Sequence, residues 1–198
     1  GDKSALAQIL AIYASAYGDT TLFLRALKLA KEVGDKSALA QILAIYASAY
    51  GDTTLFLRAL KLAKEVGDKS ALAQILAIYA SAYGDTTLFL RALKLAKEVG
   101  DKSALAQILA IYASAYGDTT LFLRALKLAK EVGDKSALAQ ILAIYASAYG
   151  DTTLFLRALK LAKEVGDKSA LAQILAIYAS AYGDTTLFLR ALKLAKEV

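Results

Sequence analysis

The chain has 198 residues, 58% of them hydrophobic, and a formal net charge of +6. This hydrophobic content exceeds the usual 45–50% or so, so the chain can form a large core. The chain contains neither Cys nor His. Disulfides and thiolate chemistry are therefore excluded, together with the side chain most often used for proton transfer and zinc binding.

A 33-residue unit, GDKSALAQILAIYASAYGDTTLFLRALKLAKEV, accounts for the whole chain. It occupies 1–33 and recurs without a substitution at 34–66, 67–99, 100–132, 133–165 and 166–198. No linker or change of composition interrupts the series, so we expect a single repeat domain, 1–198. Natural repeats diverge at surface positions and end in polar caps, whereas Lys31 and Lys64 are identical and neither end is capped. This uniformity indicates a designed sequence.

The first unit predicts two helices, Lys3–Tyr17 and Thr20–Val33, each preceded by a Gly-Asp pair. Gly18 suits the left-handed position after a helix, because it lacks a Cβ atom. Asp2 and Asp19 suit the N-cap position, where a carboxylate accepts hydrogen bonds from unpaired amides. Connections this short make successive helices pack antiparallel, so we expect an all-α protein of six helical hairpins.

The two predicted helices differ in their exposed faces. The first carries no charge between Ser4 and Tyr17 and is apolar nearly all round, which predicts burial on most sides. The second has one polar stripe and is expected to lie on the outside. That stripe consists of Thr21, Arg25, Lys28 and Glu32, with Lys31 beside it.

Side-chain size is also sorted around the first helix. A stripe of large residues contains Leu6, Ile9, Leu10, Tyr13 and Tyr17, with Ile12 flanking it; a stripe of small or weakly polar residues contains Ser4, Ala7, Gln8, Ala11, Ala14 and Ser15. We expect the small stripe to face a narrow inner lumen that holds some water. The alternative is close packing against neighbouring copies. The tyrosines are interpreted as core and rim packing and not as a ligand site. Each of their hydroxyls, where buried, needs a hydrogen-bond partner or solvent.

The uncapped ends favour a closed chain. In an open stack the first and last units would each expose an apolar face, at a cost on the order of 10 kcal/mol. Identical head-to-tail interfaces give a ring if the rotation closes and a filament if it does not. With six units the simplest closed arrangement, a closed α-solenoid or toroid, needs about 60° per repeat.

Other arrangements remain open at this point. Three repeats per turn would produce two lobes, a double winding or an exchange of units with a second chain. The stripe of small residues would then be sealed at the axis, and Gln8 would need internal partners. If the ring does not close, we expect the chains to associate with one another.

Identical uncapped two-helix units joined by Gly-Asp turns resemble the de novo designed circular tandem repeat proteins, or designed alpha-toroids. The resemblance covers all 198 residues. It implies a closed ring of helical hairpins, made as a scaffold without an assigned activity. Ankyrin and tetratricopeptide repeats fit poorly, because the chain lacks the Pro, His and Trp of their motifs.

We expect no catalytic, cofactor-binding or metal-binding residues, no cofactor and no required partner. Ser4 and Ser15 have no His to act as a base. Asp2 and Asp19 are expected at opposite ends of a hairpin, about 20 Å apart, too far for paired-carboxylate chemistry. An open scaffold that serves as a binding module is the alternative function, although identical repeats encode no specific partner.

Nucleic acid and membranes are not expected partners either. The surplus of one positive charge per unit is spread around the molecule and is interpreted as a solubility device. The uncharged segment from Ser4 to Gly18 has 15 residues, fewer than the roughly 20 that cross a bilayer. The sequence has no initiator Met and no signal peptide, so Gly1 is expected to follow a removed tag. We expect no natural location, and we expect soluble recombinant expression.

Overall fold

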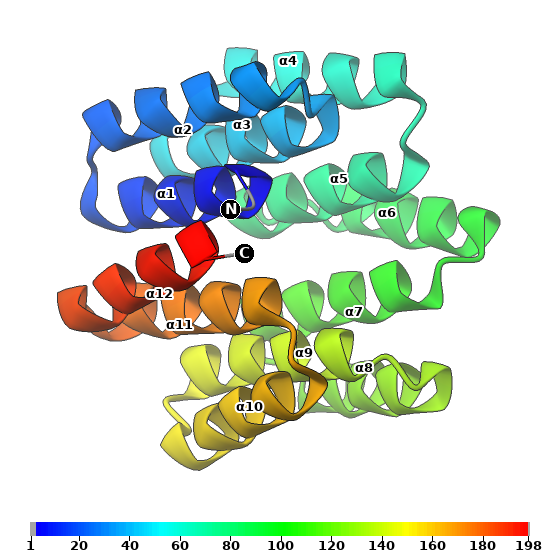
Figure 1. The fold of residues 1–198 in the computed structure, drawn as a ribbon. Coiled ribbons are helices and arrows are strands. Elements are labelled where there is room, and N and C mark those ends of the chain that lie inside the picture. Colours follow the sequence, from blue (N-terminus) through cyan, green and yellow to red (C-terminus); the bar gives the residue numbers. More distant parts are fainter. Residues whose placement is uncertain (1–2, 198) are drawn as a thin grey trace.

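The computed structural model describes residues 3–197, and within that range it contains twelve α-helices and no strand (Figure 1). The helices are α1 (Lys3–Tyr17), α2 (Thr20–Val33), α3 (Lys36–Tyr50), α4 (Thr53–Val66), α5 (Lys69–Tyr83), α6 (Thr86–Val99), α7 (Lys102–Tyr116), α8 (Thr119–Val132), α9 (Lys135–Tyr149), α10 (Thr152–Val165), α11 (Lys168–Tyr182) and α12 (Thr185–Glu197). The predicted pair of helices per unit is confirmed.

The Gly-Asp pairs end one helix and begin the next, as predicted. Gly34 has φ +73° and donates its amide to the Lys31 carbonyl at 3.1 Å. Asp19 has an extended backbone, and its Oδ1 accepts a hydrogen bond from the Leu22 amide at 3.0 Å. The predicted N-cap at Asp2 lies outside the described residues, as do Gly1 and Val198.

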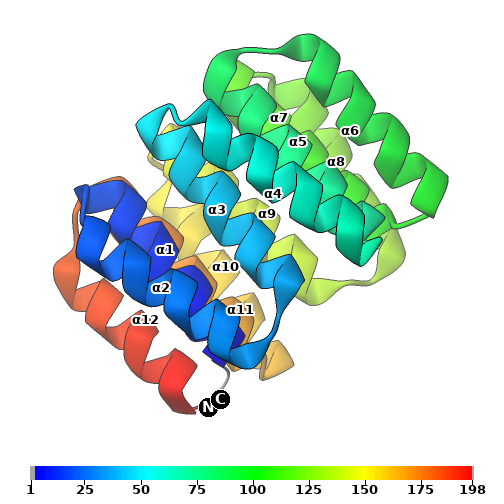
Figure 2. The same cartoon turned by 90° about the horizontal axis from the view of Figure 1, so that it is seen from above.

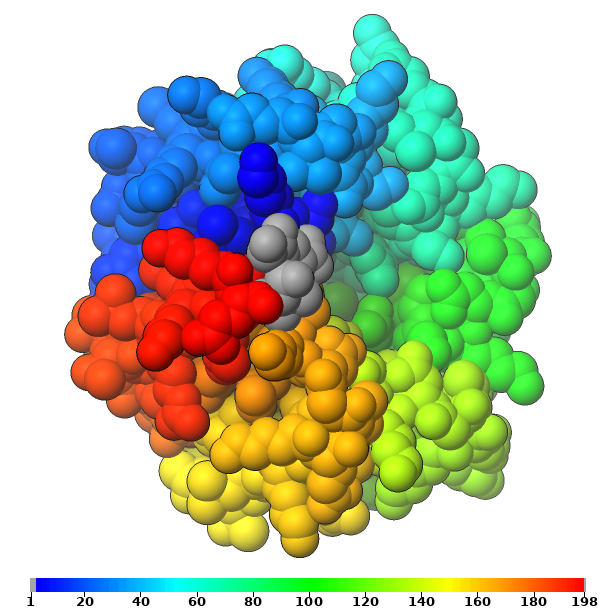
Figure 3. All heavy atoms as spheres, viewed as in Figure 1, coloured from blue at the N-terminus to red at the C-terminus, as the bar shows by residue number. Residues whose placement is uncertain are grey.

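The hairpins are arranged around a common axis, with the odd-numbered helices inside (Figures 1 and 2). Each odd-numbered helix contacts the next one, from α1 to α11, and α11 also contacts α1. Each even-numbered helix packs on its own hairpin partner and on the next inner helix, and α12 packs on α1. Figure 3 shows the first and last repeats against each other.

A circuit of three repeats would bring α5 against α1. No such contact occurs in the part of the chain that the structure describes. Consecutive outer helices do not contact each other there either, so one repeat is linked to the next through the next inner helix, which contacts both helices of the preceding hairpin.

Alanines form the contact between the two helices of each hairpin. Ala7, Ala11 and Ala14 of α1 are fully buried and share one cluster with Ala26 and Ala30 of α2. The prediction that the whole small-residue stripe faces a lumen is therefore wrong for these three alanines. Methyl side chains let the two helix backbones of one hairpin approach closely, whereas the alternative interpretation of the stripe was close packing against neighbouring copies.

One isoleucine of each repeat enters the core of the repeat before it. Ile42 of α3 is fully buried in a cluster with Phe23 and Leu10 of the first repeat. Ile9 of α1 is fully buried in a cluster with Ile174 and Phe188 of the last repeat. Burial of one such side chain stabilises the fold by about 1.5–3 kcal/mol.

The outer helices expose the predicted polar stripe and more. Thr21, Arg25, Lys28 and Glu32 are all exposed. Leu24 is also 64% exposed, so the wet face is wider than the prediction of one polar stripe implied. Its position explains the exposure, because Leu24 lies three residues after Thr21 and four before Lys28 on the same helix face.

The left-handed glycines predict a specific cost of substitution. Gly100 has φ +75°, and a Cβ atom there would have no neighbour within 4 Å, so any penalty comes from the backbone alone. Gly100→Ala should lower the free energy of unfolding by about 1–2 kcal/mol, because L-residues resist this conformation. Guanidinium unfolding followed by circular dichroism measures it. Gly100→Asn is the matched control and should lose less, since Asn tolerates the left-handed region. Equal stability of the Ala variant and the parent would contradict this account of the turn.

Candidate functional site: the central cavity and the interfaces between repeats

The inner helices line a central cavity of about 340 Å³ that is open to solvent. One Gln and one Ile from each inner helix line it: Gln8, Gln41, Gln74, Gln107, Gln140 and Gln173, with Ile12, Ile45, Ile78, Ile111, Ile144 and Ile177. Gln8, which was expected to face a lumen, therefore lies at a central cavity. Ile12, which was assigned to the edge of the large-residue stripe, lines it as well.

The glutamine side chains are hydrogen-bonded to one another in sequence. Gln8 Nε2 donates to Gln41 Oε1 at 2.8 Å, and the same bond links each Gln to its copy in the next repeat. Gln173 Nε2 donates to Gln8 Oε1 at 2.9 Å, across 165 residues of sequence. Each amide thus uses one N–H and one acceptor position, and bonds aligned in this way polarise one another.

A second polar link joins the start of the inner helices α1, α3, α5, α7 and α9 to the next repeat. Asp101 accepts a hydrogen bond from the Ala104 amide through Oδ1 at 2.9 Å and another from Ser70 Oγ through Oδ2 at 2.9 Å. One carboxylate thus caps its own helix and binds the preceding repeat. The same pairing runs from Ser4–Asp35 to Ser136–Asp167.

Aromatic contacts join the other end of the inner helices. Tyr112 packs edge-on against Phe89 of the preceding repeat, with ring centroids 4.4 Å apart. Tyr13 packs in the same way against Phe188, also at 4.4 Å. At four other boundaries the first tyrosine of the inner helix is stacked or tilted against the Phe, with centroids 3.7–4.0 Å apart. The interpretation of these tyrosines as core and rim packing is consistent with these contacts.

The second tyrosine of each inner helix covers a turn of the preceding repeat. Tyr50 Oη donates to the Ala14 carbonyl at 3.4 Å, next to Gly18. Tyr50 is 40% exposed, so water reaches its ring as well.

The serine hydroxyls take part in structural hydrogen bonds. Ser4 Oγ donates to Asp35 Oδ2 and Ser15 Oγ donates to the Ile12 carbonyl, both at 2.9 Å. Within residues 3–197, no group of three or more His, Cys, Asp or Glu side chains could hold a metal ion. None of the helices described is both long enough and apolar enough to span a bilayer.

Sequence reasoning missed the Gln–Gln and Ser–Asp bonds between repeats. Both join residues one repeat apart, or nearly so, with separations of 33 and 31 residues. A polar side chain that faces the axis of a symmetric array meets its own copies. That geometric rule would have identified the glutamines, because Gln8 was already expected at the lumen.

Comparisons with known proteins identify no family. No family model and no curated protein matches the chain. Among solved structures, the chain is similar to a "Circular tandem repeat protein with novel repeat topology and enhanced subunit contact surfaces", at 20% identity over 97% of this chain and 69% of that one. The TM-score is 0.26, too low to carry an argument about this fold.

The Ser–Asp bond predicts a measurable coupling between repeats. Ser70→Ala and Asp101→Asn, made separately and together, form a double-mutant cycle. We expect an interaction energy of about 0.5–1.5 kcal/mol, the usual net value of such a bond. The control cycle pairs Ser70→Ala with Asp134→Asn, whose carboxylate binds Ser103 instead. Additive losses in the Ser70–Asp101 cycle would show that the bond does not couple the repeats.

The glutamine bonds predict that replacement of one Gln lowers the free energy of unfolding by more than one sixth of the loss caused by replacement of all six. Gln107→Leu leaves the Gln74 donor and the Gln140 acceptor without their partners, and should cost about 1–2 kcal/mol. Replacement of all six glutamines by Leu leaves no orphaned amide, so its total cost should be far below six times that of one. Guanidinium unfolding of both variants tests this, and proportional losses would contradict it.

Proposed function

We propose that the chain is a designed structural scaffold that closes on itself as a ring of six repeats in one domain, 1–198. Its purpose is to provide a defined shape, and we assign no catalytic, cofactor-binding or metal-binding residue. No natural partner or location is assigned either.

The carrying observation is that the last and first repeats are joined by a Gln–Gln hydrogen bond and a Tyr–Phe contact, as adjacent internal repeats are. Gln173 bonds to Gln8 as Gln74 bonds to Gln107. The Phe188–Tyr13 rings match Phe89–Tyr112 in both centroid distance and edge-on geometry. Equivalent contacts at this boundary support closure, because the first and last units carry the same complementary faces.

The cost of an open chain also supports closure. Ile9 would lie on a bare end face in an open solenoid, yet it is fully buried among Ile174 and Phe188. Water contact with this face and its counterpart on the last repeat would be unfavourable by about 25 cal/mol per Å² of apolar surface.

The identity of the six repeats supports design as the origin. Surface positions are as uniform as buried ones: Lys28 and its copies are exposed in every repeat, yet none is substituted. Drift at unconstrained positions is the rule in natural arrays. A partner-specific binding surface would need differences between repeats, and the sequence contains none.

Closure predicts that a terminal residue behaves like an internal one. Tyr13→Ala and Tyr112→Ala remove equivalent half-buried rings, and each should lower the free energy of unfolding by about 2–3 kcal/mol. In an open chain Tyr13 would lie on an exposed end face, so its loss would cost little. Guanidinium unfolding of the two variants gives the comparison.

Light scattering on the same samples completes the test. A single-chain mass with equal losses supports the ring. A near-neutral Tyr13→Ala beside a destabilising Tyr112→Ala would overturn it, and a mass of two or more chains would assign closure to contacts between chains.

A further inference from the structure

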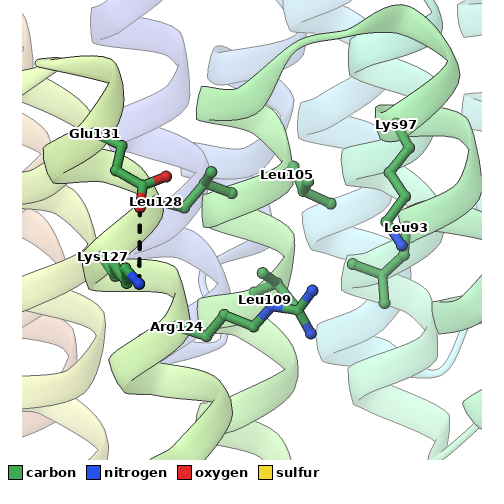
Figure 4. A pocket seen from close by; sticks show the side chains of 8 residues that line it. All are labelled: Leu93, Lys97, Leu105, Leu109, Arg124, Lys127, Leu128 and Glu131. Carbon is green, nitrogen blue, oxygen red and sulfur yellow. Dashed lines mark ion pairs between the residues drawn. The ribbon is translucent and has the colours of Figure 1, made fainter.

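Apolar grooves open on the outer surface between consecutive outer helices. The groove between α6 and α8 has a volume of about 340 Å³, and α7 forms its floor (Figure 4). Equivalent grooves of about 260–270 Å³ lie at three other boundaries of the described chain. They exist because consecutive outer helices do not contact each other there.

Leucines line the groove and basic side chains surround it. Leu105 and Leu109 of α7 lie between Leu93 of α6 and Leu128 of α8. Figure 4 shows the Arg124 side chain reaching from α8 across the groove, in front of Leu109.

The charges at the groove do not balance. Lys97, Arg124 and Lys127 face a single carboxylate, Glu131. The Lys127–Glu131 pair is 4.0 Å apart and exposed, and among the described residues neither Lys97 nor Arg124 forms an ion pair. The groove thus combines an apolar floor with two cations available to an anion.

We propose that each groove binds a single-chain alkyl carboxylate, with its head group at the Arg and Lys and its chain along the leucines. A guanidinium matches a carboxylate in bidentate geometry. The volumes lie near the lower end of the range of about 300–1,000 Å³ found for small-molecule sites, which suits one short alkyl chain. The proposal concerns boundaries within the chain and does not depend on closure.

Charge and polarity favour this occupant over two others. A nucleic acid would use the cations, but its phosphates would gain nothing from the leucine floor. A second copy of the chain would bring its own cationic outer helices against the groove, at a net charge of +6 per molecule.

Titration with sodium decanoate below its micelle concentration tests the proposal, with calorimetry as the readout. We expect saturable binding at several equivalent sites, and tighter binding of decanoate than of octanoate by up to about fourfold per methylene. Decyltrimethylammonium has the same alkyl chain and a cationic head group, and should not saturate. Equal binding of the two amphiphiles, or no saturation by decanoate, would overturn the proposal.

Matched charge variants locate the site. One variant replaces the four groove arginines by Gln: Arg58, Arg91, Arg124 and Arg157. The control replaces four lysines at the start of inner helices by Gln: Lys36, Lys69, Lys102 and Lys135. Both lose the same charge at exposed positions, and circular dichroism checks that both remain helical.

The arginine variant should bind decanoate about tenfold more weakly, and the lysine variant within about twofold of the parent. Equal weakening in both would mean that net charge alone attracts the anion, and would overturn the assignment. Sedimentation velocity shows whether decanoate instead drives association between copies, which would overturn it too.

Discussion

Everything in this molecule depends on one interface, the contact between a repeat and its successor. An Ile of one inner helix is buried in the core of the repeat before it, as Ile42 is beside Phe23. Because every unit is identical, each carries both halves of this contact. An open array of such units always exposes one half of the contact on its first repeat and the other half on its last repeat. The proposed ring follows from that constraint, and the burial of Ile9 against the last repeat agrees with it.

The interface is specific because polar and aromatic contacts lie at several heights along the inner helix. Near the start of the helix, Ser4 bonds to the N-cap Asp of the next repeat. Gln8 bonds to its own copy about one turn later, and Tyr13, five residues further on, packs against a Phe. Apolar burial alone would tolerate a slide of one helix along another. Directional bonds at several heights penalise such a slide, because each displaced partner would lose its hydrogen bond. The inner helix therefore has a defined register, although it carries no charge after its first residue.

Much of this fold could be predicted from local rules, and the rest depended on geometry between repeats. Gly18 and Asp19 mark the helix ends because a left-handed residue and a carboxylate cap act within one turn of chain. The alanines of the inner helix were harder to place, since a small residue serves a lumen and a close hairpin contact equally well. Which of the two occurs depends on the rotation between repeats, which many side chains determine together. The Gln–Gln bonds depend on the same rotation, and the outer grooves depend on the spacing it leaves between outer helices.

The distance between labels on the first and last repeats tests the central claim most directly. Because the chain has no Cys, a spin label can be placed by substitution at chosen exposed positions. One sample carries labels at Lys28 and Lys193, in repeats one and six, and the other at Lys94 and Lys127, in two adjacent internal repeats. A ring predicts the same distance distribution for both pairs by pulsed electron resonance at low concentration. A much longer distance for Lys28–Lys193 in a monomer would contradict it.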